Sequence, residues 1–184
     1  MRWKTISIGV TDMTAALPLG TFARAGDFVD VQFDRFYSHP IDKVWRALTD
    51  PERLADWMGV STVEAVVGGK IAMMIGSPGA MQGEILTWDA PNVLEFTWRN
   101  PTSPEAIVRY ALTAEGAGTR MIFTHTHMPY TSSARMMPGW HWFFDRLGAA
   151  LTGDAAAGLT YEALQDQYVA TYELSGVRLG HCDA

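Results

Sequence analysis

Two histidines at the end of an alternating stretch are the residues of this chain best suited to chemistry. His125 and His127 follow Met121 and Phe123 at every second position of 118–127. An imidazole on the apolar face of a strand can serve as a general acid or base, or donate a hydrogen bond to a ligand carbonyl. His125 is therefore the candidate catalytic residue, and the plain alternative is a histidine that is satisfied by backbone groups.

The pair His125 and His127 also places two imidazoles on one side of a strand, which is compatible with a metal ion. A metal site needs a third ligand, and spacing does not fix His141, Asp145 or Glu84 in that place. His141 and Asp145 stand four residues apart, which predicts a surface contact on one helix face. We therefore expect no metal site and no cofactor.

Two further charged residues, Glu84 and Arg109, fall on middle strands of the expected sheet. If they faced inward they would orient a polar ligand group, but an unpaired buried charge is costly. We therefore expect both on the solvent face. The chain has no G-x-S-x-G elbow, phosphate loop or Cys-x-x-Cys motif, so no serine or cysteine nucleophile with its base can be assembled.

Aromatic side chains are numerous, with seven Trp, eight Phe and six Tyr among 184 residues. Strand alternation puts aromatic rings on one face of 92–99 and 118–127, and helical spacing puts them on one stripe of 138–152. If these faces meet, they either enclose a hollow or fill a core. The expected ligand-binding residues are Trp57, Phe96, Trp98, Tyr110, Phe123, His125, Trp140, Phe143 and Phe144.

These side chains are positioned by a strand, two short helices, a series of strands and a long helix. The first strand is expected at 28–37, the short helices at 40–48 and from Asp50 to Trp57, and the long helix at 138–152. Six further strands are expected at 61–67, 70–76, 80–88, 92–99, 105–114 and 118–127. Short connections rich in Gly and Pro predict antiparallel hairpins.

Length and composition indicate one domain with extensions. We expect an N-terminal extension at 1–26, the domain at 27–152, and a C-terminal extension at 153–184 with a helix at about 160–174. A short strand at 6–10 is compatible with the alternation there. The net charge of −6, without a basic stripe, argues against nucleic acid as a partner.

Targeting signals are weak in this chain. No segment approaches the ~20 apolar residues that a membrane span needs. Asp12 and Pro18 interrupt the apolar stretch that follows the first residues, which argues against a signal peptide. The lone Cys182 cannot form an internal disulfide, which favours a reducing compartment, and we expect a cytoplasmic protein.

A set of residues in a specific order carries a further signal: Pro40, Val44, Trp45, Leu48, Thr49, Asp50, Pro51, Leu54, Trp57, Gly68, Gly69, Gly83, Glu84, Ile85, Pro91, Leu94, Phe96, Trp98, Thr119, Arg120, His125, Gly139, Trp140 and Leu147. Through them residues 28–152 resemble the SRPBCC superfamily, which includes the birch-pollen-allergen-like and START domains, and within it the activator of heat-shock protein 90 ATPase homologues. The resemblance implies an α+β helix-grip fold. Its curved antiparallel sheet of six to seven strands wraps a long C-terminal helix, and two short helices follow the first strand.

The resemblance implies a cavity between sheet and long helix, suited to a small hydrophobic or amphipathic molecule, but not one function. Our first expectation is a non-enzymatic binding protein for such a ligand. One alternative is an enzyme of the cyclase or hydrolase kind, with His125 as acid–base and Arg109 or Tyr110 assisting. Another is a chaperone-interacting protein. A homodimer built on the extensions also fits the sequence.

Overall fold

The computed structural model describes residues 18–75, 80–100, 103–155 and 158–174. Within them, eight strands form one antiparallel sheet in the order β1-β2-β8-β7-β6-β5-β4-β3. The strands are β1 Thr21–Ala25, β2 Phe28–Tyr37, β3 Ser61–Val63, β4 Lys70–Met74, β5 Ala80–Asp89, β6 Val93–Asn100, β7 Ser103–Glu115 and β8 Gly118–Pro129. The helices are α1 Ile41–Thr49, α2 Pro51–Trp57, α3 Ser133–Thr152 and α4 Tyr161–Tyr172, and a 3₁₀ turn occupies Tyr130–Ser132.

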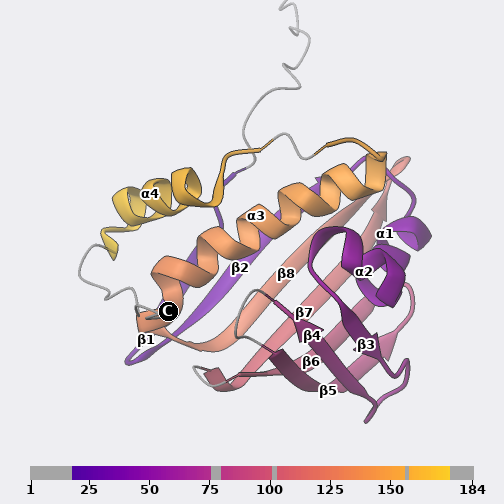
Figure 1. Ribbon diagram of the computed structural model, residues 1–184, viewed down its shortest axis with the longest axis horizontal. Coiled ribbons are helices and arrows are strands. Elements are labelled where there is room, and N and C mark those ends of the chain that lie inside the picture. Colours follow the sequence, from indigo (N-terminus) through magenta and orange to yellow (C-terminus); the bar gives the residue numbers. More distant parts are fainter. Residues whose placement is uncertain (1–17, 76–79, 101–102, 156–157, 175–184) are drawn as a thin grey trace, which may run out of the picture.

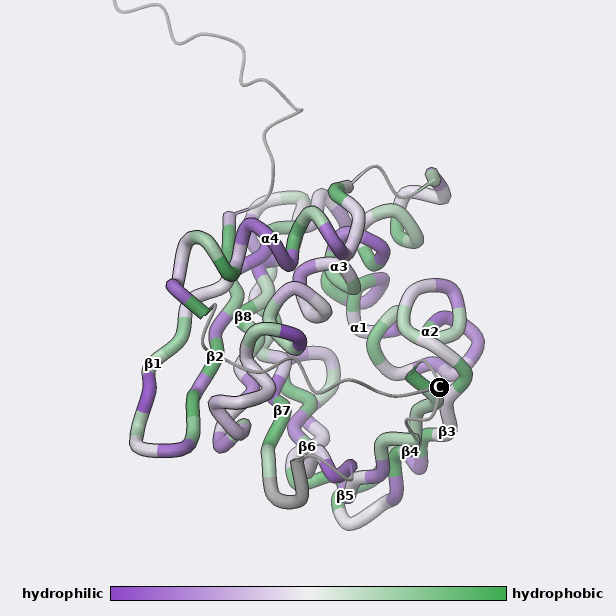
Figure 2. Tube along the Cα trace, turned by 60° about the vertical axis from the view of Figure 1, so that its left-hand side comes forward, coloured by the Kyte–Doolittle hydropathy of each residue, from purple (hydrophilic) through white to green (hydrophobic). Residues whose placement is uncertain are grey.

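One face of the curved sheet is covered by helices. Figure 1 shows α3 lying along this face, with α1 and α2 beside one end of it and α4 on the flank near β1 and β2. Figure 2 shows hydrophobic and hydrophilic residues interleaved along the strands, as expected when one face packs against helices and the other meets water. None of the described helices is long and apolar enough to cross a membrane.

The sheet has eight strands in the described residues, not the expected six to seven. The missed strand is β1, which pairs with β2 through a turn at Gly26. It carries no apolar alternation because it is an edge strand whose side chains are almost all exposed. Since β1 comes first, the two short helices follow the second strand, not the first. The strand considered at 6–10 lies outside the described residues.

The long helix begins at Ser133, ahead of the expected start at 138. The helix expected at about 160–174 is present as α4. Pro138 lies inside α3 instead of opening it. A proline there leaves the carbonyl of Ala134 without its helical donor. The side chain of Gln165, on α4, donates to that carbonyl at 3.3 Å. A contact with a distant helix therefore allows α3 to run through the proline.

Gly83, on β5, is required by a close approach between strands. A Cβ at this position would overlap the carbonyl oxygen of Thr97 on β6. We expect Gly83→Ala to lower the free energy of unfolding by about 3 kcal/mol, because neighbouring backbone cannot yield as a side chain can. Urea unfolding followed by circular dichroism measures this.

The matched control is Gly139→Ala on α3, where the nearest atom to the new Cβ is Tyr161 Cε2 at 3.8 Å. There the same substitution should raise the free energy of unfolding by about 0.5–1 kcal/mol, since alanine restricts the unfolded chain and suits a helix. Equal effects at the two glycines would contradict the close approach at Gly83.

Candidate functional site

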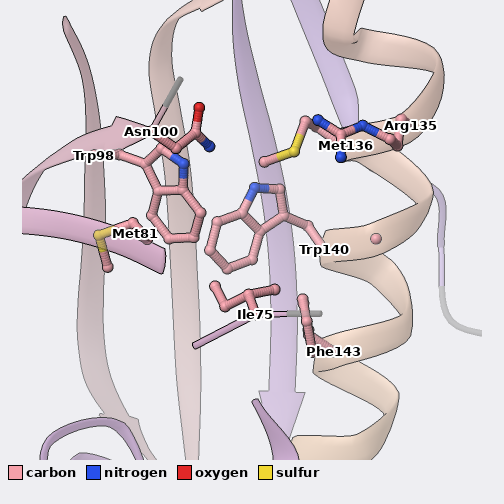
Figure 3. Close-up of a pocket in the computed structure, with 9 residues that line it drawn as sticks. Ile75, Met81, Trp98, Asn100, Arg135, Met136, Trp140 and Phe143 are labelled. Atoms are coloured by element: carbon pink, nitrogen blue, oxygen red, sulfur yellow. The ribbon is translucent and has the colours of Figure 1, made fainter. Parts of the chain in front are cut away.

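A small cavity lies between strands β4 to β6 and the N-terminal half of α3. Its volume is about 90 Å³. Its wall has six apolar side chains, the backbone of Gly139 and two polar residues, Asn100 and Arg135; the apolar side chains are those of Ile75, Met81, Trp98, Met136, Trp140 and Phe143. In Figure 3 the indoles of Trp98 and Trp140 lie side by side in the wall. Arg135 is exposed, so the polar part of the wall lies at the surface.

Sheet alternation and helix spacing bring the two tryptophans together. On β6, every second residue points inward, which places Leu94, Phe96 and Trp98 on the covered face. Trp140 comes from the buried side of α3. The Trp98 and Trp140 ring centroids are 5.0 Å apart in an edge-to-face arrangement, and Phe123 on β8 lies 4.4 Å from Trp140. The cavity is thus the part of the sheet–helix interface that these rings leave unfilled.

The structure divides the residues expected to bind a ligand into two groups. Trp98, Trp140 and Phe143 line the cavity. The remainder lie in the core away from its wall, and all are buried: Trp57, Phe96, Tyr110, Phe123, His125 and Phe144. The space between sheet and helix is therefore mostly filled by side chains. The cavity is smaller than the roughly 300–1,000 Å³ of a site for a drug-sized ligand.

His125 is fully buried and packs against Trp98 and Trp140. Its Nδ1 accepts a hydrogen bond from the Trp140 indole at 3.0 Å, so the neutral ring carries its proton on Nε2. Nε2 and the Trp98 indole nitrogen have no hydrogen-bond partner among the described residues. Burial lowers the pKa of His125 to about 3. The neutral imidazole does not line the cavity, and its hydrogen bond helps to position Trp140, which does.

His127 does not share the inward face of His125, although both belong to the same alternating pattern. The register of β2 against β8 shifts between Val29 and Val31, and His127 adopts a φ of 56°. This bulge turns His127 outward and places Met128 inside. In the part of the chain that the structure describes, no group of three or more potential ligands lies close enough to hold a metal.

Glu84 and Arg109 lie on the outer face of the sheet, as expected. Lys70 on the neighbouring strand pairs with Glu84 at 2.8 Å, and Glu95 pairs with Arg109 at 3.0 Å. Ion pairs of this kind on an exposed face contribute little to stability and do not reach the cavity. These two charges therefore do not belong to the candidate site.

The expectation that His141 and Asp145 form a surface contact is wrong. His141 is 3% exposed, and its Nδ1 lies 3.0 Å from the hydroxyl of Tyr168 on α4. Its Nε2 lies 3.8 Å from Asp145. The helix stripe alone suggested an outward position because nothing local to α3 shows that α4 covers this flank.

Arg35 is a buried residue that the sequence reasoning missed. It is 2% exposed and occupies an inward position of β2, between Phe33 and Tyr37. The sequence could have revealed this position, because Arg35 falls on the same face of the alternating strand 28–37 as the apolar residues. It lies near Tyr168 of α4 and does not line the cavity.

A wider hollow of about 640 Å³ lies on the surface between α1, α2 and the C-terminal end of α3. Its charged residues are of both signs: Asp42, Lys43, Arg46, Arg53 and Asp56. This hollow does not have an apolar wall on one side and a polar group on the other. Its lining therefore does not indicate a class of ligand. The smaller cavity under α3 remains the candidate site.

Comparisons with known proteins agree on the fold. The model of the family described as activator of Hsp90 ATPase homolog 1-like protein matches residues 38–152. The crystal structure of CalU16 from Micromonospora echinospora is 23% identical, with a TM-score of 0.67 over 79% of this chain and 87% of that chain. Protein MLL2253 from Mesorhizobium loti is 26% identical, with a TM-score of 0.60 over 68% of this chain and 98% of its own.

DynU16, from the dynemicin biosynthetic locus, is also similar. It is 26% identical, with a TM-score of 0.63, and the match covers 69% of this chain and 49% of that one. No curated protein matches the chain.

Proposed function

The chain belongs to the family of activator of Hsp90 ATPase homolog 1-like proteins, and from that premise we propose that it binds a small amphipathic molecule in the cavity under α3. The observation that carries the proposal is the composition of the cavity wall. Six apolar side chains surround the space, and Asn100 and Arg135 stand at its polar end. Such a wall suits an apolar body with one polar group.

The size of the cavity limits the apolar part of the ligand. A cavity of about 150 Å³ in another protein holds a benzene molecule, and this one measures about 90 Å³. Met81 and Met136 contribute flexible, polarisable side chains that adapt to irregular shapes. A short alkyl chain, which is narrower than a ring, is therefore the apolar body that best fits.

Arg135 favours a negative charge at the polar end. It is exposed and takes part in none of the ion pairs found among the described residues. A cation next to an apolar pocket attracts a ligand whose polar group is an anion. Hexanoate and 1-hexanol have the same alkyl chain and differ in charge. Comparing them separates the contribution of the apolar wall from that of the Arg135 charge.

We expect hexanoate to shift the NMR signals of the Trp98 and Trp140 indole N–H groups in a saturable way. Arg135→Gln should weaken hexanoate binding by a factor of about 2 to 5, as for the loss of an exposed charge pair, and leave 1-hexanol unaffected. Met136→Trp, which adds a ring to the wall, should weaken both ligands by about tenfold or more.

The control for an added indole is Leu159→Trp, at an exposed position that does not line the cavity. This variant should bind both ligands as the unmodified protein does. If Met136→Trp leaves both titrations unchanged, the ligands bind elsewhere and the proposal is wrong.

A further inference from the structure

The guanidinium of Arg35 is buried between β2, α3 and α4 with much of its hydrogen-bonding capacity unused. Its Nη1 donates to the carbonyl of Asp34 at 3.0 Å. Its Nε and Nη2 have no hydrogen-bond partner in the described parts of the chain. A buried donor that lacks an acceptor costs free energy, so such a group requires a physical explanation.

The charge of Arg35 also lacks a close partner: Asp145 and Asp34 act on it electrostatically, but neither forms an ion pair with it. None of the ion pairs among the described residues includes it. The ring centroids of Phe33 and Phe144 lie 5.0 and 5.9 Å from its guanidinium carbon, so aromatic faces supply part of its environment. Buried cations in proteins are normally paired with an anion. The surroundings of Arg35 therefore favour a directly paired anion, which the described residues do not supply.

The two unused nitrogens form the edge of the guanidinium that suits an oxyanion. Arg120 shows this on the outer face of the same sheet, where its Nε donates to Asp34 Oδ1 at 2.9 Å and its Nη2 to Asp34 Oδ2. Two parallel N–H groups match two oxygens of one carboxylate or phosphate. The same two nitrogens of Arg35 have no acceptor among the described residues.

Two polar side chains, Tyr168 on α4 and His141 on α3, lie close enough to Arg35 to interact with its charge. The Tyr168 hydroxyl accepts a hydrogen bond from the Gly20 N–H at 2.7 Å and lies 3.0 Å from His141 Nδ1. Besides Tyr168, the buried residue of α4 is Leu164. A helix anchored by few buried side chains is the element of this region that opens at the lowest free energy.

We propose that the Nε–Nη2 edge of Arg35 is a second binding site, for a small oxyanion of the carboxylate or phosphate class that enters beneath α4. The site is separate from the cavity, because Phe33, Asp34 and Phe144, which contact Arg35, do not line the cavity. Asp145, on α3, is the rival acceptor within the chain, since it interacts with the charge of Arg35 and pairs only loosely with His141.

The test is a titration of the full chain with sodium phosphate and with sodium acetate at pH 7 and constant ionic strength. We expect the NMR signal of the Arg35 Nε–H to shift and saturate, while that of Arg120, already paired, stays in place. Saturation by acetate alone would narrow the site to planar carboxylates. No shift of the Arg35 signal in 100 mM of either anion overturns the proposal.

Arg35→Met supplies the second measurement, because methionine keeps an unbranched side chain and removes the charge. The variant should unfold at a higher temperature than the unmodified protein without added anion, since an unpaired buried charge is gone. It should also lose the rise in unfolding temperature that phosphate or acetate produces. An equal rise in both proteins places the anion elsewhere and overturns the proposal.

The variant Asp145→Asn shows whether Arg35 binds an anion from solution or the carboxylate of Asp145. If the Arg35 signal responds to anions in both proteins, the site accepts external oxyanions. If it responds only after the substitution, Asp145 is the natural partner and the proposal is wrong. These outcomes leave the cavity proposal untouched, because its signals are the indole N–H groups of Trp98 and Trp140.

Discussion

Lowering the pH from 7 to 4.5 should reduce the free energy of unfolding steeply, because two buried histidines stay neutral in the folded chain. Burial lowers the pKa of His125 from 6.5 to about 3. Burial, with a smaller contribution from the Arg35 charge, lowers the pKa of His141 to about 4. Below pH 6.5 the unfolded chain binds protons that the folded chain refuses, so stability falls as the pH falls. Each histidine contributes up to about 1.4 kcal/mol per pH unit in that window.

The groups around each histidine determine the direction in which its pKa shifts. His125 packs against the rings of Trp98 and Trp140, which supply no charge to hold a proton. His141 faces Arg35, which opposes protonation, and Asp145. Burial raises the pKa of Asp145, so this carboxyl takes up its proton earlier in the folded chain and acts in the opposite direction.

His125→Gln isolates one histidine, because glutamine retains an acceptor for the Trp140 indole. Urea unfolding at pH 8, 7, 6 and 5 should show a slope between pH 6 and 5 that is smaller by about 1.4 kcal/mol per pH unit than that of the unmodified protein. Between pH 8 and 7 the two curves should run parallel, which is the internal control. Identical slopes at low pH would show that His125 is not held neutral.

Phe144→Ala is expected to lower the free energy of unfolding by about 3–5 kcal/mol, the cost of deleting a fully buried aromatic ring. Phe144 is 0% exposed and contacts the rings of Phe33, Phe123 and Trp140. Those partners come from β2, β8 and α3, which hydrogen bonding and helix packing hold in place. The core around the deleted ring therefore cannot collapse to fill the space, and urea unfolding at pH 7 measures the loss.

Phe143→Ala is the matched control, since it deletes the same ring one residue earlier on α3. Phe143 is half-buried and already borders the cavity. Its removal should cost less than half as much, because less surface returns to water and fewer contacts are lost. Equal losses at the two positions would contradict the view that Phe144 is part of the packed core while Phe143 borders the cavity.

Much of the fold was predictable from local pattern. Alternation identified 28–37 as a strand, and β2 occupies those residues. Asp50 and Pro51 predicted the start of the second short helix, where the Asp50 side chain accepts a hydrogen bond from the Glu52 N–H at 3.0 Å. Edge strand β1 was not predictable, because backbone pairing with β2 forms it and its side chains carry no pattern.

The candidate site was predictable only in part. Parity and helical spacing placed Trp98, Trp140 and Phe143 inside, and the structure brings all three to one cavity. The same alternation predicted that His127 faces inward like His125, but a bulge in β8 turns His127 outward. A bulge depends on the register of two strands that lie far apart in the sequence, so no local pattern reveals it.

The sequence by itself determined most of the elements and most of the inward-facing side chains, because alternation and helical spacing act over a few neighbouring residues. Only the tertiary structure decided which inward polar groups have partners. Trp140 satisfies His125 Nδ1, Gln165 satisfies the carbonyl that Pro138 leaves free, and no described residue satisfies two nitrogens of Arg35. Each of these outcomes depends on contacts between segments far apart in the chain, and such contacts exist only after the sheet and helices have packed.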